Sequence, residues 1–227
     1  MVRRIGTNGS EVIPGTIFND VLLGLGGNDI LRGGFGNDNL NGGFGADTLL
    51  GGAGNDKLRD DSSDANVLSG GSGNDRLLAF GGAGPIGIVT TMLGGGGRDL
   101  LINGAGNTFM NGGGGNDGLI GGQGADFQVG GGGADRFGFA DNDGFFFNFF
   151  QNGTGGFDDV IFDFTPGVDK LVMSGIVVEA VFDSFDANFG PGVAVQYNDA
   201  FNVGPDGFIF LDGLVAAQLT PGDFLFV

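Results

Sequence analysis

Ten aspartates recur between residues 15 and 138 of this 227-residue chain, mostly at intervals of nine residues. Each aspartate ends a short glycine-rich stretch, and a large apolar residue, U, follows two positions later in a unit GGxGxDxUx. Regularly spaced carboxylates beside carbonyl-rich loops suit a hard cation, and flexible loops suit calcium better than magnesium. The chain contains no His and no Cys, which excludes zinc and copper chemistry. The predicted calcium-binding side chains are Asp20, Asp29, Asp38, Asp47, Asp56, Asp75, Asp99, Asp117, Asp126 and Asp135.

Each unit divides into a loop and a short strand. Its first six residues place glycines where the backbone must adopt φ > 0 or approach another group closely. Its last three alternate as a strand does, so the middle residue faces a core. Two units per coil would stack same-side loops every 18 residues at about the 4.8 Å strand spacing. The predicted core residues, with Gln128 as the polar exception, are Leu22, Leu31, Leu40, Leu49, Leu58, Leu77, Leu101, Met110, Leu119 and Phe137.

Stacking the coils brings like charges together. Asp20, Asp38 and Asp56 should share one edge, and Asp29 and Asp47 the other. Carboxylates about 5 Å apart repel by roughly 3 kcal/mol per pair at an effective dielectric constant near 20. We therefore expect cations between the loops.

These units resemble the calcium-binding nonapeptide of the RTX (repeats-in-toxin) proteins, over residues 15–138. The resemblance implies an all-β fold, a parallel β-roll in which each Ca²⁺ lies between loop n and loop n+2. The sixth-position aspartates and carbonyls of the glycine-rich loops would hold the ions. The carbonyl ligands that we expect on this basis belong to Gly24, Gly33, Gly34, Phe35, Gly36, Asn37, Gly42, Gly43, Gly51, Gly112, Gly113, Gly121 and Gly130.

Two breaks interrupt the series. Residues 60–69 number ten instead of nine and place Ala65 at the ligand position, and residues 79–93 number fifteen. We expect both to form bulges or side loops that disturb the register between two shorter rolls. Unit 103–111 presents Thr108 in place of an aspartate, so the site that it shares with Asp126 should be weak or missing.

Residues 139–227 follow a different pattern and predict a β-rich capping unit, whereas residues 1–14 form a lead-in. The segment FFFNFF (145–150) should cover the open end of the roll. We expect a turn at ADNDG (140–144). Parts of this region, including its ending Asp223-Phe-Leu-Phe-Val, are similar to the C-terminal region of serralysin-type secreted peptidases, without their catalytic domain. That similarity implies a type I secretion signal.

Composition narrows the function. The net charge of −18, with 25 Asp and 2 Glu, argues against nucleic acid and anionic membranes as partners. We expect neither a secretory signal peptide at the start nor a membrane span. An enzyme is not expected, because the chain has no His for a zinc helix or triad and no Cys nucleophile. We expect the strand-end carboxylates Asp158, Asp159, Asp163 and Asp169 to be solvated rather than catalytic.

Two functions stay open. The first is a secreted, extracellular calcium-binding protein that folds on external calcium and serves a structural, surface, matrix or adhesion role. The second is an accessory export or folding module related to secreted enzymes, similar to the repeat modules of alginate epimerases. Its partners would be the type I export machinery and extracellular polysaccharide or the cell surface.

Overall fold

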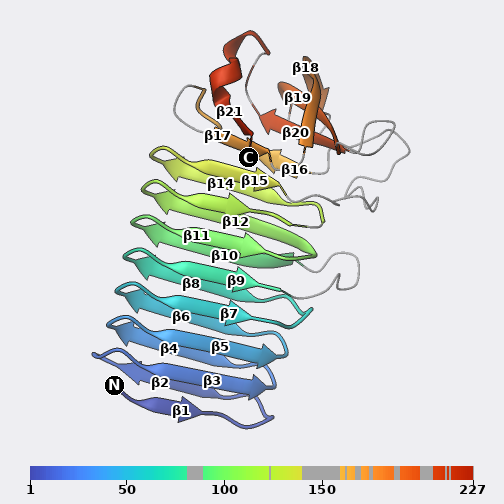
Figure 1. The fold of residues 1–227 in the computed structure, drawn as a ribbon. Coiled ribbons are helices and arrows are strands. Elements are labelled where there is room, and N and C mark those ends of the chain that lie inside the picture. Colours follow the sequence, from blue (N-terminus) through green and yellow to red (C-terminus); the bar gives the residue numbers. More distant parts are fainter. Residues whose placement is uncertain are drawn as a thin grey trace.

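The computed structural model is a β-solenoid in which the chain winds between two sheets, whose strands pair parallel throughout the repeats (Figure 1). It describes residues 1–80, 89–122, 124–139, 159–161, 163–166, 170–173, 176–186, 190–199, 207–212, 214 and 216–226. The expectations for segments 140–144 and 145–150, Asp158 and Asp169 lie outside these residues.

Successive strands alternate between the two sheets as far as residue 186. Sheet A contains β1 (Arg3–Ile5), β3 (Val21–Gly26), β5 (Asn39–Phe44), β7 (Lys57–Asp60), β9 (Arg76–Ala79), β11 (Leu100–Asn103), β13 (Gly118–Ile120), β15 (Arg136–Phe139), β17 (Lys170–Met173) and β21 (Phe224–Phe226). Sheet B contains β2 (Val12–Thr16), β4 (Ile30–Phe35), β6 (Thr48–Ala53), β8 (Val67–Ser72), β10 (Val89–Gly96), β12 (Asn107–Gly114), β14 (Phe127–Gly132), β16 (Asp159–Ile161), β18 (Ile176–Asp186), β19 (Gly190–Asp199) and β20 (Gly207–Asp212). The strands β18, β19 and β20 follow one another in sheet B and pair antiparallel. Two short 3₁₀ helices, η1 (Ala216–Gln218) and η2 (Pro221–Asp223), precede the last strand.

The register confirms two nine-residue units per coil. Leu22 pairs with Leu40, and Leu31 pairs with Leu49, each 18 residues apart. The prediction of two shorter rolls is wrong, because the sheets continue across both breaks. Val67 pairs with Thr48 after one extra residue, and Thr91 pairs with Val67. The extra residues fall in the connections from sheet A to sheet B, where a longer loop leaves the strand pairing intact.

The core is a pair of stacked columns between the sheets. Each column gains one side chain per coil, and burial of a leucine contributes about 2 kcal/mol. Gln128, buried between Met110 and Ile161 in the register, is the polar member. The sheet A column contains Leu22, Leu40, Leu58, Leu77, Leu101, Leu119, Phe137 and Leu171, and the sheet B column contains Ile13, Leu31, Leu49, Leu68, Met92, Met110, Ile161 and Leu211.

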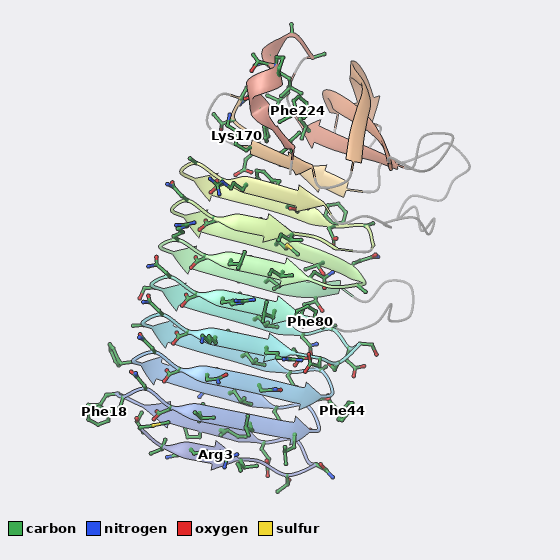
Figure 2. The ribbon with its side chains drawn as sticks, viewed as in Figure 1. Arg3, Phe18, Phe44, Phe80, Lys170 and Phe224 are labelled. Carbon is green, nitrogen blue, oxygen red and sulfur yellow. The ribbon has the colours of Figure 1, made fainter. Side chains whose placement is uncertain are left out.

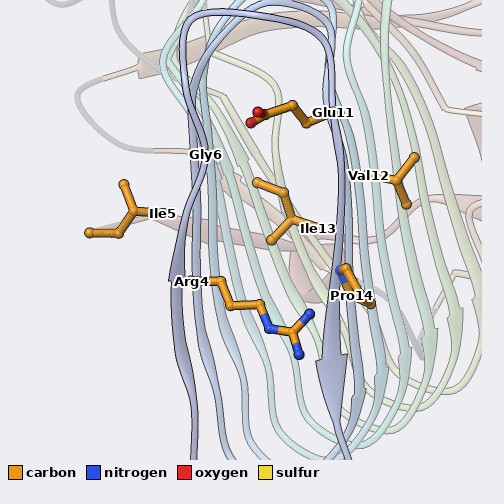
Figure 3. Close-up of a pocket in the computed structure, with 7 residues that line it drawn as sticks. All are labelled: Arg4, Ile5, Gly6, Glu11, Val12, Ile13 and Pro14. Atoms are coloured by element: carbon orange, nitrogen blue, oxygen red, sulfur yellow. The ribbon is translucent and has the colours of Figure 1, made fainter.

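At the N-terminal end, β1 and β2 form the first coil, which takes up most of the expected lead-in, residues 1–14, and extends to Thr16. A hollow of about 580 Å³ opens between these strands. Figure 3 shows Arg4 and Ile13 directed into the hollow, whereas Ile5 and Val12 point away. Arg4 pairs with Leu22 and so takes the first place in the sheet A column. An inward-pointing charge at a sheet end discourages further strand pairing.

At the other end, the sheets run on into the C-terminal region. β17 and β21 extend sheet A, and β16 and β20 extend sheet B. The ring of Phe164 packs against Phe137 at a centroid distance of 6.1 Å. Lys170 and Phe224 belong to this end of the molecule (Figure 2). Among the described residues, the last repeat is therefore covered by side chains such as Ile161, Phe164 and Leu171.

Candidate metal centre

The predicted aspartates form a continuous ladder along one edge of the roll. At this edge, called the continuous edge, sheet B strands turn into sheet A strands. The backbone N–H of each aspartate donates to Oδ1 of the aspartate one coil further on, at 2.7–2.8 Å. Both breaks in the repeat leave this ladder intact. Its members are Asp20, Asp38, Asp56, Asp75, Asp99, Asp117 and Asp135.

The other edge, called the interrupted edge, mixes charged and neutral residues. Here Asp29 N–H donates to Asp47 Oδ1 at 2.7 Å, and Asp47 N–H donates to Asn66 Oδ1 at 2.8 Å. Asn66, not Ala65, therefore holds the ligand position, because the extra residue lies before it. Thr90 and Thr108 take the next two positions in the register. Thr108 N–H donates to Asp126 Oδ1 at 2.8 Å.

Asparagines at the fifth position of the units build a second ladder, which the sequence analysis missed. Here the later coil donates to the earlier one: Asn55 N–H donates to Asn37 Oδ1 at 2.8 Å, and Asn74 N–H to Asn55 Oδ1 at 2.7 Å. The repeated Asn-Asp dipeptide was the available signal. The two ladders run in opposite directions and tie each coil to both neighbours.

In seven of the ten predicted aspartates, the second carboxylate oxygen is buried and accepts no hydrogen bond from a donor group of the described residues. This holds among the described residues for Oδ2 of Asp29, Asp38, Asp47, Asp56, Asp75, Asp99 and Asp117. An unsatisfied buried carboxylate oxygen is costly, so it requires a proton or a cation.

Each of these oxygens faces a space that exists because a glycine has no side chain. A Cβ atom added to Gly33 would collide with Asp38 Oδ2 and with the Gly51 carbonyl oxygen of the next coil. Gly24 has the same relation to Asp29 and Gly42. In the same arrangement, the carboxylates of Asp56, Asp99 and Asp117 lie beside the carbonyl oxygens of Gly70, Gly112 and Gly130 respectively.

The remaining predicted carbonyl ligands have other surroundings. The Gly24 carbonyl faces Gly6 beside Glu11, and the Gly33 carbonyl faces Gly15. The carbonyls of Gly34, Gly36 and Gly113 face the equivalent glycine one coil on, which is Gly52, Gly54 and Gly131 respectively. Gly43 adopts a positive φ of 104°, and Gly121 lies beneath Asp126. The side chain of Phe35 is exposed. Asn37 belongs to the asparagine ladder. Gly70 was not among the predicted ligands.

Asp20 differs from the other members of its ladder. Its Oδ1 accepts from Val2 N–H at 2.6 Å, and its Oδ2 accepts from both the N–H and the hydroxyl of Thr16 at 2.7 Å. Burial alone would raise the pKa of Asp20, but these hydrogen bonds lower it below its usual value. Thr16 replaces the second glycine of a regular unit. Its N–H and hydroxyl therefore supply Oδ2 of Asp20 with the hydrogen bonds that Oδ2 lacks in the regular loops.

Asp60 is a buried acidic residue that the sequence analysis did not consider as a ligand. It occupies the place of the first glycine in the unit after Arg59, and its side chain is fully buried. Its Oδ2, like that of Asp47, accepts no hydrogen bond from a donor group among the described residues, and the carboxyl groups of Asp47 and Asp60 lie next to each other.

Burial favours the protonated form of several of these carboxyl groups. Burial raises the pKa of Asp56, Asp75 and Asp99 to about 6; the hydrogen bond from the neighbouring aspartate offsets part of the rise, and that neighbour's charge adds to it. Burial also raises the pKa of Asp60 to about 7, and the charge of Asp47 contributes. Negative charge in these sites is therefore unfavourable unless a cation accompanies it.

The donor set fits a calcium ion. In the described part of the chain, no three His, Cys, Asp or Glu side chains form one metal-binding group. On the continuous edge, a carboxylate oxygen instead lies beside a glycine carbonyl from the next coil at Asp38, Asp56, Asp99 and Asp117. Calcium accepts such mixed, flexible oxygen ligands more readily than magnesium does.

The family model for the RTX calcium-binding nonapeptide repeat matches residues 5–40, 33–59, 60–83, 91–110 and 102–137. The chain belongs to this family. A comparison with curated proteins found no match. The repeats therefore bind several Ca²⁺ ions, and the β-roll is a structural calcium-binding fold. The match begins at residue 5, because Gly6, Gly9, Glu11 and Ile13 already follow the unit pattern. The similarity of the C-terminal region to serralysin-type peptidases stays a prediction.

Proposed function

We propose that this protein is an extracellular structural component whose roll closes when calcium fills the spaces between its coils. The observation that supports it is the series of buried carboxylate oxygens that lack partners along the continuous edge. With several like charges stacked at successive coils, the calcium-free roll is self-repelling. External calcium, in the millimolar range typical of extracellular modules, would remove that repulsion.

The two edges should bind unequal numbers of ions. On the continuous edge, the regular sites belong to Asp38, Asp56, Asp75, Asp99 and Asp117, and a glycine carbonyl from the next coil lies beside four of these carboxylates, those of Asp38, Asp56, Asp99 and Asp117. On the interrupted edge, the neutral residues Asn66, Thr90 and Thr108 remove three carboxylates. Calcium would therefore act mainly as a column along one edge.

A surface, matrix or adhesion role agrees with RTX repeats being typical of secreted bacterial proteins. In the part of the chain that the structure describes, no helix is both long enough and apolar enough to cross a membrane. For export we propose that segment 139–227 carries a type I secretion signal, including Asp223 to Val227.

A second role is an export or folding module that serves a separate enzyme and contacts polysaccharide. The continuation of sheet A into β17 and β21 favours it, because a C-terminal unit that extends the sheets can nucleate the roll.

Binding of the full chain to an acidic polysaccharide such as alginate, measured by calorimetry with calcium and with chelator, discriminates the two roles. Saturable, calcium-dependent binding supports the accessory module, whereas absence of binding with full calcium-dependent folding supports the structural component. In a host with a type I exporter, segment 139–227 fused to an unrelated passenger should be secreted. Intracellular retention of that fusion would contradict the export signal.

A further inference from the structure

The irregular segment after Arg59 contains a carboxylate where the other units have glycine. In a regular unit the first glycine presents its carbonyl to the aspartate of the preceding coil, as Gly42 does to Asp29. One coil further on, the residue that faces Asp47 is Asp60. Its side chain, rather than only its backbone, therefore reaches the space above Gly42.

Two carboxylate oxygens converge on that space. A Cβ atom added to Gly42 would collide with both Asp47 Oδ2 and Asp60 Oδ2. Asp60 is 0% exposed and Asp47 is 1% exposed. Neither oxygen accepts a hydrogen bond from a donor group among the described residues, and the two carboxyl groups lie within hydrogen-bonding reach of each other. Two buried, unsatisfied oxygens aimed at one small space indicate a missing positive charge.

Neighbouring groups hold the pair in this arrangement. Asp60 Oδ1 accepts from the Ser62 N–H at 2.9 Å and from Asn66 Nδ2 at 2.8 Å. Asn66 also accepts the Asp47 N–H on its Oδ1 at 2.8 Å. One asparagine thus orients both acidic residues and leaves their Oδ2 atoms free to share a ligand. The extra residue in this segment gives the chain room to place Ser62 and Asn66 around Asp60.

No basic side chain of the described residues neutralises the pair. The nearest cation in sequence, Arg59, pairs with the exposed Asp61 at 2.9 Å, and no ion pair of the described chain includes Asp47 or Asp60. The atoms nearest to a Cβ added at Gly42 are the Oδ2 atoms of Asp60 and Asp47 and the Cβ of Asp47. This donor set and this charge suit a divalent hard cation.

We propose that Asp47 and Asp60 form a two-carboxylate calcium site, which binds calcium more tightly than the one-carboxylate sites on the continuous edge. This inference rests on the calcium-dependent roll proposed above. The site has twice the negative charge of a regular one, and calcium affinity rises with the number of charged ligands. It is filled first as calcium rises and orders the coils on both sides of the break.

The test is a calcium titration of the full chain in competition with a chromophoric chelator. Asp60→Asn keeps the shape of the side chain and removes its charge, and Asp60→Gly restores the residue of a regular unit. Asp61→Asn is the control, because Asp61 is adjacent in sequence and exposed. Circular dichroism at saturating calcium verifies that each variant is folded. Both Asp60 variants should weaken the tightest calcium constant by about tenfold or more, whereas Asp61→Asn should leave it unchanged.

Two results would overturn the site. One is that the tightest calcium dissociation constant of Asp60→Asn equals that of Asp61→Asn. The other is a gain in stability of Asp60→Asn in chelator with an unchanged calcium titration, which would show that the pair shares a proton. In either case the wild type still gains β-structure with calcium. If the wild type gained none, the proposed function itself would fail.

Discussion

The backbone N–H of Asp38 donates a 2.7 Å hydrogen bond to Oδ1 of Asp56 in the next coil. The other oxygen of Asp56 is buried without a partner and faces the space above Gly51. One carboxylate therefore joins two coils through one oxygen and offers the other oxygen to a cation. In the calcium column that we propose, the same side chain joins the coils and binds the ion, and substitutions can separate these two contributions.

Substitution of Asp56 should separate the ladder bond from the calcium ligand. Asp56→Asn keeps an acceptor for the Asp38 N–H, as Asn66 does for Asp47, and removes the charged ligand. Asp56→Ala removes both. We expect both variants to lose one calcium ion in calorimetry, and Asp56→Ala to lose a further ~1–2 kcal/mol of unfolding free energy at saturating calcium. Equal calcium stoichiometry in wild type and Asp56→Asn would contradict the ligand assignment.

Asp20 should behave differently from its ladder neighbours. Because Thr16 and Val2 already satisfy both of its oxygens, Asp20→Asn should leave the number of bound calcium ions unchanged. Asp38→Asn should reduce that number by one. Loss of a calcium ion in Asp20→Asn, measured by the same calorimetric titration, would show that the threonine bonds yield to the metal.

In chelator, mild acid should partly replace calcium. Burial raises the pKa of Asp56, Asp75 and Asp99 to about 6 in the calcium-free roll, above the value near 3.9 of an unfolded aspartate. The folded state then binds more protons than the unfolded state between about pH 4 and 6, so its stability falls as pH rises through that window.

The β-signal in circular dichroism with chelator should therefore be larger at pH 5 than at pH 7.5. With calcium present, the β-signal should instead be larger at pH 7.5 than at pH 5, because protons compete with the ion for the carboxylates. The calcium concentration at the midpoint of folding should therefore rise as pH falls below 6. A calcium-free signal that does not change between pH 5 and 7.5 would contradict the buried, unpaired state of these carboxylates.

The contact between Phe164 and Phe137 should decide how well the last repeats fold. Phe164 is 4% exposed and its ring packs on Phe137. Phe164→Ala should destabilise the calcium-loaded roll by about 3 kcal/mol and raise the calcium needed for folding. Phe44, 78% exposed on an edge of the roll (Figure 2), provides the control. Equal thermal midpoints for Phe164→Ala and Phe44→Ala would show that the C-terminal region does not cap the repeats.

The nine-residue period was sufficient to predict the roll, its core columns and the stacking of the aspartates. A period fixes which residue faces inward, and Leu22 and Leu40 lie where it places them. The breaks were harder, because a sequence count does not show where an extra residue is absorbed. The count placed Ala65 at the ligand position, and only the strand pairing of Val67 shows that Asn66 holds it.

Departures from the repeat pattern were also the least predictable parts of the site. Thr16 and Asp60 each replace a glycine, and their effects depend on contacts with Asp20 and Asp47 respectively. Neither contact follows from composition or spacing. Gly6 and Glu11 indicate the first coil, because they hold the first and sixth positions of a unit. That unit was not recognised, because its sixth residue is a glutamate instead of an aspartate.

The most direct test of the account is the far-ultraviolet circular dichroism of the full chain in chelator and in millimolar calcium at pH 7.5. Short strands on a glycine-rich chain cannot offset backbone entropy of roughly 1–2 kcal/mol per residue while the ladder carboxylates repel one another. The account predicts a largely disordered spectrum in chelator and a cooperative change to β-structure as calcium is added. Equal β-content in chelator and in calcium would contradict it.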